Sequence, residues 1–251
     1  MPMGVLKCPI MPSYLFPLKD RREIAEGTMA FWFDTSGTDF SFKPGQYANF
    51  EFADAPNSNP DDNSHVFSLA SSPHHKDSVM IAVRMRDSSA FKAALSKAPL
   101  GTKLKVSRPL GKFLLHEDPS KPAVFLAGGI GITPFLSIVG WHTHHKSPHR
   151  IRLFYSNRTP ASTAFLQELS EWEKQNPNFQ LIPTVTDVDD PQWKHEQGFL
   201  DEEMIRKYVS DMDQAIFYVV GPPAMVDAMD QLLQGMEIPK DRIRLEKFDG
   251  Y

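Results

Sequence analysis

The chain has 251 residues, of which 41% are hydrophobic and 23% charged, which fits a globular protein of one large or two smaller domains. A formal net charge of −4 provides no field that could hold a polyanion, so nucleic acid is not an expected partner. The single cysteine, Cys8, rules out an intramolecular disulfide and a four-cysteine zinc or iron–sulfur site within this chain.

Residues 1–20 are expected to be a leader, and residues 21–117 have the pattern of an antiparallel β-barrel domain. The apolar segments there are short and rich in β-branched and aromatic residues, and several alternate with polar residues. Turn-forming sequences such as "APNSNPDDN" (55–63) separate them, as in a small barrel. The expected strands are 29–34, 46–52, 65–71, 79–85 and 103–109, with one helix at 89–98.

Residues 121–251 show a different pattern, in which predicted strands alternate with predicted helices. This alternation indicates a parallel sheet covered by helices on both faces. The charged, proline-containing segment 115–122 is the expected boundary between the two domains. The expected strands are 123–128, 151–157, 180–186, 215–221 and 242–248, and the expected helices are 133–145, 162–175, 201–209 and 223–236.

A glycine-rich turn, "GGIGITP", joins the first strand of this sheet to its first helix. Ligands of open α/β sheets bind beyond the carboxyl ends of the strands, where such turns lie. Glycines let a phosphate approach the backbone, Thr133 can cap the helix and Pro134 suits its first turn. The sequence also fits a tight strand–helix turn without a ligand. The candidate nucleotide-binding residues are Gly128, Gly129, Ile130, Gly131, Thr133 and Pro134.

The order of these features resembles the ferredoxin–NADP reductase family of flavoproteins: a strand-rich domain, then "GGIGITP", then "VVGPPAMV" (219–226). The similarity extends from about Arg22 to Tyr251. It implies a six-stranded antiparallel flavin-binding β-barrel, followed by a Rossmann-like α/β domain with a parallel sheet that binds NADH or NADPH. It also implies a reductase that passes electrons from the nicotinamide cofactor through FAD to a separate acceptor.

The implied acceptor is a separate protein, such as a ferredoxin, an oxygenase component or a haem protein, or a small molecule. Two alternatives stay open: an NAD(P)H:flavin reductase that releases reduced flavin, and a non-catalytic nucleotide-binding subunit of a larger complex. No apolar run approaches the roughly 18 residues of a membrane span, and the first residues lack the pattern of a signal peptide. We therefore expect a cytoplasmic location.

The sequence "HVFSLAS" (65–71) resembles the family's barrel strand that holds the flavin ring. The resemblance implies that Phe67 packs against the isoalloxazine, beside Val66, and that Ser68 hydrogen-bonds flavin N5 as a catalytic residue. An aromatic ring offers flat apolar contact, and a hydroxyl can both donate and accept. The family usually has arginine where this chain has His65, so we expect weaker or pH-sensitive binding of the flavin phosphate.

The helix start after the next strand resembles the family's site for the flavin diphosphate. Ser89 is the matching hydroxyl, and the N–H groups of Ala90 and Phe91 follow it. Arg84 or Arg86 could supply the positive charge that a histidine lacks, and both should face the same way because strand side chains alternate. The flavin-binding candidates on the preceding strand are Val83, Arg84 and Met85.

The sequence "VVGPPAMV" resembles the family's strand end beside the nicotinamide. The resemblance implies that Gly221 and Pro222 shape the turn and that Met225 lines the nucleotide cleft. Many family members carry cysteine just before the glycine. This chain has Val220 there, which removes any contribution of a thiol to hydride transfer.

The C-terminal sequence "RLEKFDGY" resembles the family's terminal Glu-x-Tyr, whose ring covers the second flavin face. This implies catalytic roles for Glu246 and Phe248. Tyr251, three residues further on, competes for the role of the covering ring, and a tail without function is the alternative for it.

The resemblance implies that the adenosine ribose of the nucleotide binds at "YSNRTP" (155–160), which contains Ser156, Asn157 and Arg158. Arg158 could bind the 2′-phosphate of NADP. However, "TVTDVDD" (184–190) places Asp187 where NADPH-specific members often have arginine, and a carboxylate disfavours a phosphate. The sequence slightly favours NADH.

Four histidines gather near the end of a predicted helix, in "WHTHHKSPH" (141–149). They lack a nearby cysteine or carboxylate, so we interpret them as a solvated helix end and expect no metal site. They are His142, His144, His145 and His149.

Overall fold

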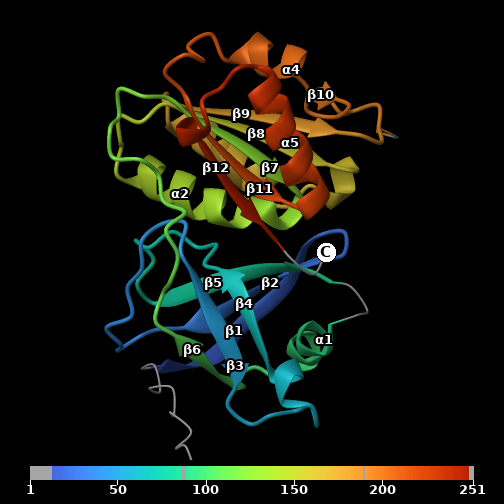
Figure 1. Cartoon of the computed structure of the whole chain (residues 1–251). Helices are drawn as coiled ribbons and strands as arrows, with labels where there is room; N and C mark the ends of the chain where they lie inside the picture. The colour runs from blue at the N-terminus through green and yellow to red at the C-terminus, as the bar shows by residue number, and fades with distance from the viewer. Residues whose placement is uncertain (1–12, 86–88, 189, 249–251) are drawn as a thin grey trace, which may run out of the picture.

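The computed structural model describes residues 13–85, 89–188 and 190–248, which form two stacked domains (Figure 1). Each domain is built on a six-stranded sheet, antiparallel in the first and parallel in the second. This confirms the predicted fold class, an antiparallel β-barrel followed by a Rossmann-like α/β domain.

The antiparallel sheet has the strand order β4-β3-β6-β1-β2-β5 and curls into a barrel. The backbone N–H of Ala70, just after β4, donates to the carbonyl of Met80 on β5 at 2.8 Å, so the two edges of the sheet meet. Phenylalanines such as Phe16, Phe31 and Phe50 fill the interior and are fully buried. The strands are β1 (Ser13–Ala25), β2 (Thr28–Asp34), β3 (Tyr47–Phe52), β4 (Ser64–Ser68), β5 (Ser78–Arg84) and β6 (Lys103–Ser107).

Strand β1 begins at Ser13, inside the segment that the sequence analysis assigns to a leader. It pairs with β2 on one side and β6 on the other, so it is a central strand of the barrel. Its second half, "KDRREI", is largely charged because part of it meets solvent, and an irregularity between Leu18 and Asp20 interrupts the alternation. Residues 13–20 therefore belong to the barrel rather than to a leader.

Helix α1 (Ala90–Lys97) packs on the barrel through Phe91 and Leu95, which lie one turn apart in the core. The helix follows β5, and the short 3₁₀ turn η1 (Pro60–Asn63) lies beside it.

The parallel sheet has the order β10-β9-β8-β7-β11-β12 and carries helices on both faces (Figure 1). Every residue of β7 and β11 is buried, as expected for central strands covered on both sides. Helices α2 and α3 pack on one face, and α4 and α5 on the other. The strands are β7 (Ala123–Gly128), β8 (Ile151–Asn157), β9 (Phe179–Val185), β10 (Glu196–Gln197), β11 (Ile216–Gly221) and β12 (Ile243–Lys247). The helices are α2 (Ile132–His144), α3 (Leu166–Gln175), α4 (Glu202–Tyr208) and α5 (Pro223–Gly235), with 3₁₀ turns η2 (Gly129–Gly131), η3 (Pro160–Ser162) and η4 (Lys240–Arg242).

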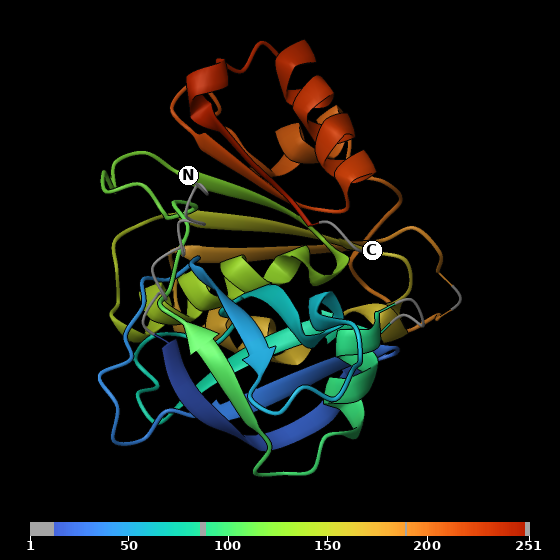
Figure 2. The ribbon, with the colours of Figure 1, turned by 60° about the horizontal axis from the view of Figure 1, so that its bottom comes forward.

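Helix α2 lies between the parallel sheet and the barrel, as Figures 1 and 2 both show. Its residues from Ile132 to Gly140 are all buried. Phe135 stacks on Phe125 of β7 with ring centroids 4.4 Å apart. On the barrel side, Oγ of Ser137 donates to the carbonyl of Ser71 at 2.8 Å. One helix therefore joins the cores of the two domains.

The segment that connects the domains is fastened to the parallel sheet through His116. Its backbone N–H donates to the hydroxyl of Tyr218 at 2.9 Å, and that hydroxyl donates to Nδ1 of the imidazole at 3.0 Å. Nε2 donates to the carbonyl of Lys121 at 2.9 Å, and Arg244 donates to the carbonyl of Leu114 at 2.8 Å. A neutral imidazole satisfies all of these contacts, and burial lowers the pKa of His116.

Two further histidines lie beside this segment. The ring centroids of His142 and His149 are 5.0 Å apart, and those of His149 and His116 are 5.5 Å apart. Within the described part of the chain, Nδ1 of His142 is buried without a hydrogen-bond partner. Burial, together with the neighbouring imidazoles, lowers the pKa of His142 to about 4.

We expect His142 to make the folded protein less stable as the pH falls from about 6.5 toward about 4, because the unfolded chain takes up a proton there first. Leucine has a similar size and does not titrate. The melting temperature of His142→Leu should therefore fall less than that of the wild type between roughly pH 7 and pH 4.5. His195→Leu, at an exposed position, serves as the control, and its melting temperature should fall with pH as much as that of the wild type. An equal fall in the melting temperatures of the wild type and of His142→Leu would contradict the prediction.

Candidate functional site

A cleft of about 620 Å³ opens where the barrel meets the second domain. One wall comes from β4, β5 and α1, and the other from the η2 turn, the start of α2 and the end of β12. The cleft therefore depends on how the two domains are held together. Of the residues predicted from the sequence, it brings together His65, Val66, Phe67, Ser68, Val83, Arg84, Ile130, Thr133, Glu246 and Phe248.

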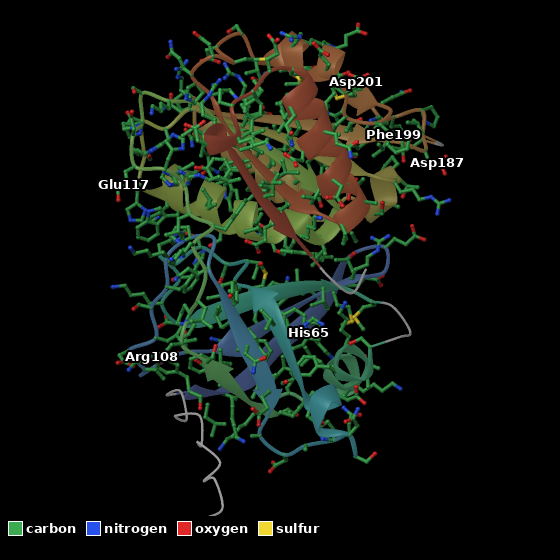
Figure 3. The ribbon with its side chains drawn as sticks, viewed as in Figure 1. His65, Arg108, Glu117, Asp187, Phe199 and Asp201 are labelled. Carbon is green, nitrogen blue, oxygen red and sulfur yellow. The ribbon has the colours of Figure 1, made fainter. Side chains whose placement is uncertain are left out.

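His65 lies on β4 in the barrel (Figure 3), where its ring stacks on that of Phe67 at 4.6 Å with 14° between the planes. Its Nδ1 lies 2.9 Å from the carbonyl oxygen of Val66. A carbonyl can only accept, so this contact assigns the proton to Nδ1 and leaves Nε2 as an acceptor. Burial lowers the pKa of His65, the Val66 carbonyl opposes this, and the charge of Lys92 lowers the pKa further. The imidazole is therefore neutral at pH 7.

Ser68 ends β4 and lies opposite Tyr47 of β3 in the sheet register. Both residues line the cleft, although Ser68 is only 8% exposed. Val66, two residues earlier on the same face of the strand, is 51% exposed. The strand thus holds the Ser68 side chain in a fixed place beside the cleft.

Strand β5 contributes Val83 and Arg84 to the cleft wall. Nη1 of Arg84 donates to Oγ1 of Thr28 on β2 at 3.2 Å, which ties the guanidinium to the neighbouring strand. Met85 packs against the barrel core instead.

On α1, the residue that reaches the cleft is Lys92, which the sequence analysis does not single out. Ser89 caps the helix by accepting a hydrogen bond from the Lys92 N–H at 3.3 Å, Ala90 begins it, and Phe91 turns into the barrel core. Lys92 is only 7% exposed. The one signal in the sequence is that it stands three residues before the buried Leu95, but a helical lysine is usually solvated.

The opposite wall is the end of the chain that the structure describes. Glu246 on β12 pairs with Val220 of β11, and burial raises the pKa of its carboxyl to about 7. Phe248 follows the strand, and its backbone N–H donates to the carbonyl of Gly221 at 3.0 Å. Lys247 between them forms an ion pair with Asp227 at 2.6 Å. The rival ring predicted from the sequence, Tyr251, lies outside the described residues.

Gly128, Gly131 and Gly221 allow two strand ends to pack closely together. A Cβ at Gly131 would lie 2.7 Å from the carbonyl carbon of Val220, and one at Gly128 would overlap the sulfur of Met225. A Cβ at Gly221 would lie 3.1 Å from the same sulfur. The turn before α2 and the turn before α5 therefore need these glycines for their own packing, whatever binds beyond them.

The rest of the turn leads from β7 into α2. Gly129 has a φ of 52°, a left-handed conformation that favours glycine. Ile130 and Thr133 line the cleft, but the Thr133 hydroxyl donates to the Ile130 carbonyl at 3.0 Å and does not cap the helix as expected, because the helix begins one residue earlier. Pro134 lies in the first turn of α2, as predicted, and Pro222 immediately precedes α5.

Four more predicted residues lie at the carboxyl ends of β8 and β9, outside the lining of the cleft. Ser156 and Asn157 end β8, and within the described residues Nδ2 of Asn157 is buried without a hydrogen-bond partner. Nε of Arg158 lies 3.9 Å from Oδ2 of Asp187, and both side chains are exposed. Asp187, labelled in Figure 3, therefore stands directly beside the arginine at the surface of the second domain.

Among the described residues, no three histidine, cysteine or acidic side chains are grouped so that they could hold a metal ion. None of the helices within the described ranges is long and apolar enough to cross a membrane.

Residues 125–231 match the family model of the oxidoreductase NAD-binding domain. The reductase component of propane 2-monooxygenase from Mycolicibacterium smegmatis is 28% identical over 214 residues, which is 83% of this chain and 60% of that relative. The chain thus spans less than two thirds of the relative's length.

Solved structures share the fold over nearly the whole chain. The Amycolatopsis cytochrome P450 reductase GcoB has a TM-score of 0.78 at 24% identity, covering 95% of this chain and 71% of that one. A ferredoxin NADP⁺ reductase from Neisseria gonorrhoeae with bound FAD and NADP has a TM-score of 0.75 at 19% identity, covering 94% of this chain and 98% of that one. These likenesses confirm the two-domain fold.

The packing at Gly131 predicts that Gly131→Ala lowers the free energy of unfolding by about 1–3 kcal/mol, because the new methyl group must displace the backbone of β11. Gly235→Ala is the matched control. Gly235 ends α5 with nothing within 4 Å of its would-be Cβ, so alanine there should be neutral or slightly stabilising. Denaturant unfolding of the two variants measures the difference, and equal midpoints would show that the close approach at Gly131 does not limit stability.

Proposed function

We propose that this chain is a member of the ferredoxin–NADP reductase-like oxidoreductases and acts as an NAD(P)H-dependent flavoprotein reductase, supported by the match to the NAD-binding domain model and by the shared two-domain fold. Bound FAD would accept a hydride from the nicotinamide cofactor and release electrons to a separate acceptor. The observation that carries the proposal is the cleft shared by both domains, where Ser68 of the barrel and Glu246 and Phe248 of the second domain line one space.

The chemistry of the cleft fits a flavin. Its volume of about 620 Å³ is in the range of pockets for cofactor-sized ligands. Among its described lining residues, Arg84, Lys92 and Lys247 are cations and Glu246 is the one carboxyl, which is about half protonated at pH 7. A cleft with this excess of positive charge suits the diphosphate of FAD.

In the proposed complex, each residue at the reacting end has a distinct task. Ser68, fixed by its strand, would hold the reacting edge of the flavin through its hydroxyl. Phe248 would shield the flavin and would have to move aside to admit the nicotinamide cofactor. Glu246, with a pKa near 7, can hold or release a proton beside the ring under working conditions.

We propose NADH as the preferred electron donor. The support is the position of Asp187 beside Arg158, because the carboxylate offsets the charge that would attract a 2′-phosphate and can accept hydrogen bonds from ribose hydroxyls. The unpartnered amide of Asn157, at the end of the neighbouring strand, offers a further donor to the same nucleotide.

The proposed acceptor is an oxygenase component, because the Mycolicibacterium smegmatis relative is named as the reductase component of a monooxygenase. A ferredoxin, a haem protein and a small molecule are the alternative acceptors, and release of the reduced flavin is a further route. The proposal places the flavin domain before residue 117 and the nucleotide domain after residue 121. It also includes a cytoplasmic location, where nicotinamide dinucleotides are available.

The test of this function is anaerobic reduction of the FAD-loaded protein by NADH, followed as loss of the visible flavin band. We expect Ser68→Ala to slow reduction about tenfold or more, because a positioned hydrogen bond in the transition state is lost. Ser170→Ala is the control, since its hydroxyl bonds only within α3, to the Leu166 carbonyl at 2.7 Å. If the wild type binds no FAD, or if NADH leaves the flavin band unchanged, the proposed function is wrong. If NADH reduces the wild type and reduces Ser68→Ala at the same rate, only the role of Ser68 is wrong.

The Arg158–Asp187 pair yields a separate prediction about the nucleotide. Asp187→Ser should raise kcat/KM for NADPH about tenfold, because the arginine becomes available to the 2′-phosphate, and should lower it moderately for NADH. Asp213→Ser makes the same change in net charge at an exposed position before β11 and should leave both values unchanged. The measurement is steady-state kinetics with each donor, and an NADH:NADPH ratio in Asp187→Ser equal to that of the wild type would rule out this pair as the determinant.

A further inference from the structure

The turn between β1 and β2 reaches from the barrel to the second domain (Figure 1). It consists of Glu26 and Gly27, and the backbone N–H of Glu26 donates to the carbonyl of Ala161 at 2.9 Å. Ala161 lies in η3 and directly follows the loop 155–160, to which the proposed function assigns the adenosine of the nucleotide. A main-chain hydrogen bond therefore connects the barrel to this loop.

The other side of the same turn is bonded to the wall of the cleft. The carbonyl of Gly27 accepts a hydrogen bond from the backbone N–H of Met85 at 2.8 Å. Oγ1 of Thr28 accepts one from Nη1 of Arg84 at 3.2 Å, and Arg84 ends β5 and lines the cleft. Residues 26–28 thus contact both the cleft wall and the second domain.

The loop that receives the bond is itself held firmly. Oγ1 of Thr159 accepts from the Ser162 N–H at 3.2 Å, and Oγ of Ser162 accepts from the Thr159 N–H at 3.0 Å, which forms a capping box around η3. One residue earlier, the carbonyl of Arg158 accepts from the Asp187 N–H at 2.8 Å. A shift of Ala161 would therefore carry Thr159 and Arg158 with it.

Under the proposed function, one dinucleotide has to reach two places at once. Its adenosine would bind near Arg158, and its nicotinamide has to meet the flavin in the cleft. The reaction of two bound rings depends steeply on their relative position, and a misplacement of about 1 Å can cost on the order of 100-fold in rate. A fixed distance between the loop and the cleft wall therefore matters more for the reaction than for binding of the adenosine half.

We propose that the backbone N–H of Glu26 is a positioning group: by holding the Ala161 carbonyl, it sets the loop 155–160 at the distance from the cleft at which the nicotinamide meets the flavin. This inference rests on the proposed function, since it takes a nicotinamide dinucleotide and a flavin as the two ligands. It assigns to Glu26 no contact with either of them. The Glu26 side chain is exposed, so the role belongs to the backbone N–H.

Proline at position 26 removes this N–H and suits the turn. Gly27 has a φ of 63°, whereas Glu26 is not left-handed, which is the pattern of a type II turn with proline favoured at its first central position. Glu26→Ala keeps the N–H and is the matched control. Stopped flow measures the rate of flavin reduction in the FAD-loaded protein at saturating NADH. Calorimetry measures the affinity for ADP-ribose, which has the adenosine half of the dinucleotide but no nicotinamide.

We expect Glu26→Pro to reduce its flavin about fivefold or more slowly than the wild type, because a hydrogen bond that aligns the two sites is lost. Its FAD content and its affinity for ADP-ribose should equal those of the wild type, because each site keeps its own contacts. Glu26→Ala should match the wild type in all three measurements.

The outcomes separate this inference from the proposed function. Flavin reduction in Glu26→Pro at the wild-type rate overturns the inference, and so does equal slowing in Glu26→Ala, which would assign the effect to the side chain. Loss of FAD or of ADP-ribose affinity in Glu26→Pro also overturns it, because the N–H would then support one site and not the distance between two. A wild type whose flavin NADH does not reduce overturns the proposed function itself.

If Glu26→Pro does not fold, as judged by its melting curve, hydrogen exchange of the Glu26 amide in the FAD-loaded wild type provides the test. Coupling is reciprocal, so a bond that helps a dinucleotide to reach both sites must in turn be held closed by the bound dinucleotide. NAD⁺ should therefore slow exchange of this amide about fivefold more than ADP-ribose does. Equal exchange with the two ligands overturns the inference.

Discussion

Helix α2 is the element on which the rest of the structure depends, because it is buried on every side from Ile132 to Gly140. A helix in this position must be apolar all round and must have small residues where its neighbours come close. Gly140 meets that condition: a Cβ there would lie 2.9 Å from the ring of Trp172 and 3.2 Å from Ser72. The second domain and the barrel thus contact the same turn of helix α2.

The cleft is a consequence of this packing. Ile130 and Thr133, at the start of α2, form part of one wall, and the β4 wall is tied to the same helix through Ser71 and Ser137. Opening the cleft by moving the domains would break the shared core. By contrast, Phe248 is only partly buried where it packs against this core, and it follows the last strand. In the proposed complex, moving this one ring would admit a second planar ligand without separating the domains.

The sequence predicts the two sheets well because each has its own hydrophobic period. Ten of the fifteen described residues that line the cleft are among its candidates, six of them in "HVFS" and "LEKF". It misses β1, whose charged second half hides the alternation, and it misplaces the start of α2 by one residue. It also misses Lys92, because nothing in the sequence separates a buried lysine of a helix from a solvent-exposed one. The spacing of apolar residues in a sequence indicates the buried face of a helix or strand only where that face is apolar.

Burial shifts the pKa values of titratable side chains in the cleft away from the ordinary values of their residue types. Arg158 and Asp187 are both exposed at 3.9 Å, where solvent screens their attraction. In the cleft, burial raises the pKa of Glu246 to about 7 and lowers the pKa of His65, which the charge of Lys92 lowers further. Burial is the largest cause of both shifts. A substitution that admits water to the cleft would therefore lower the pKa of Glu246 and raise that of His65 together.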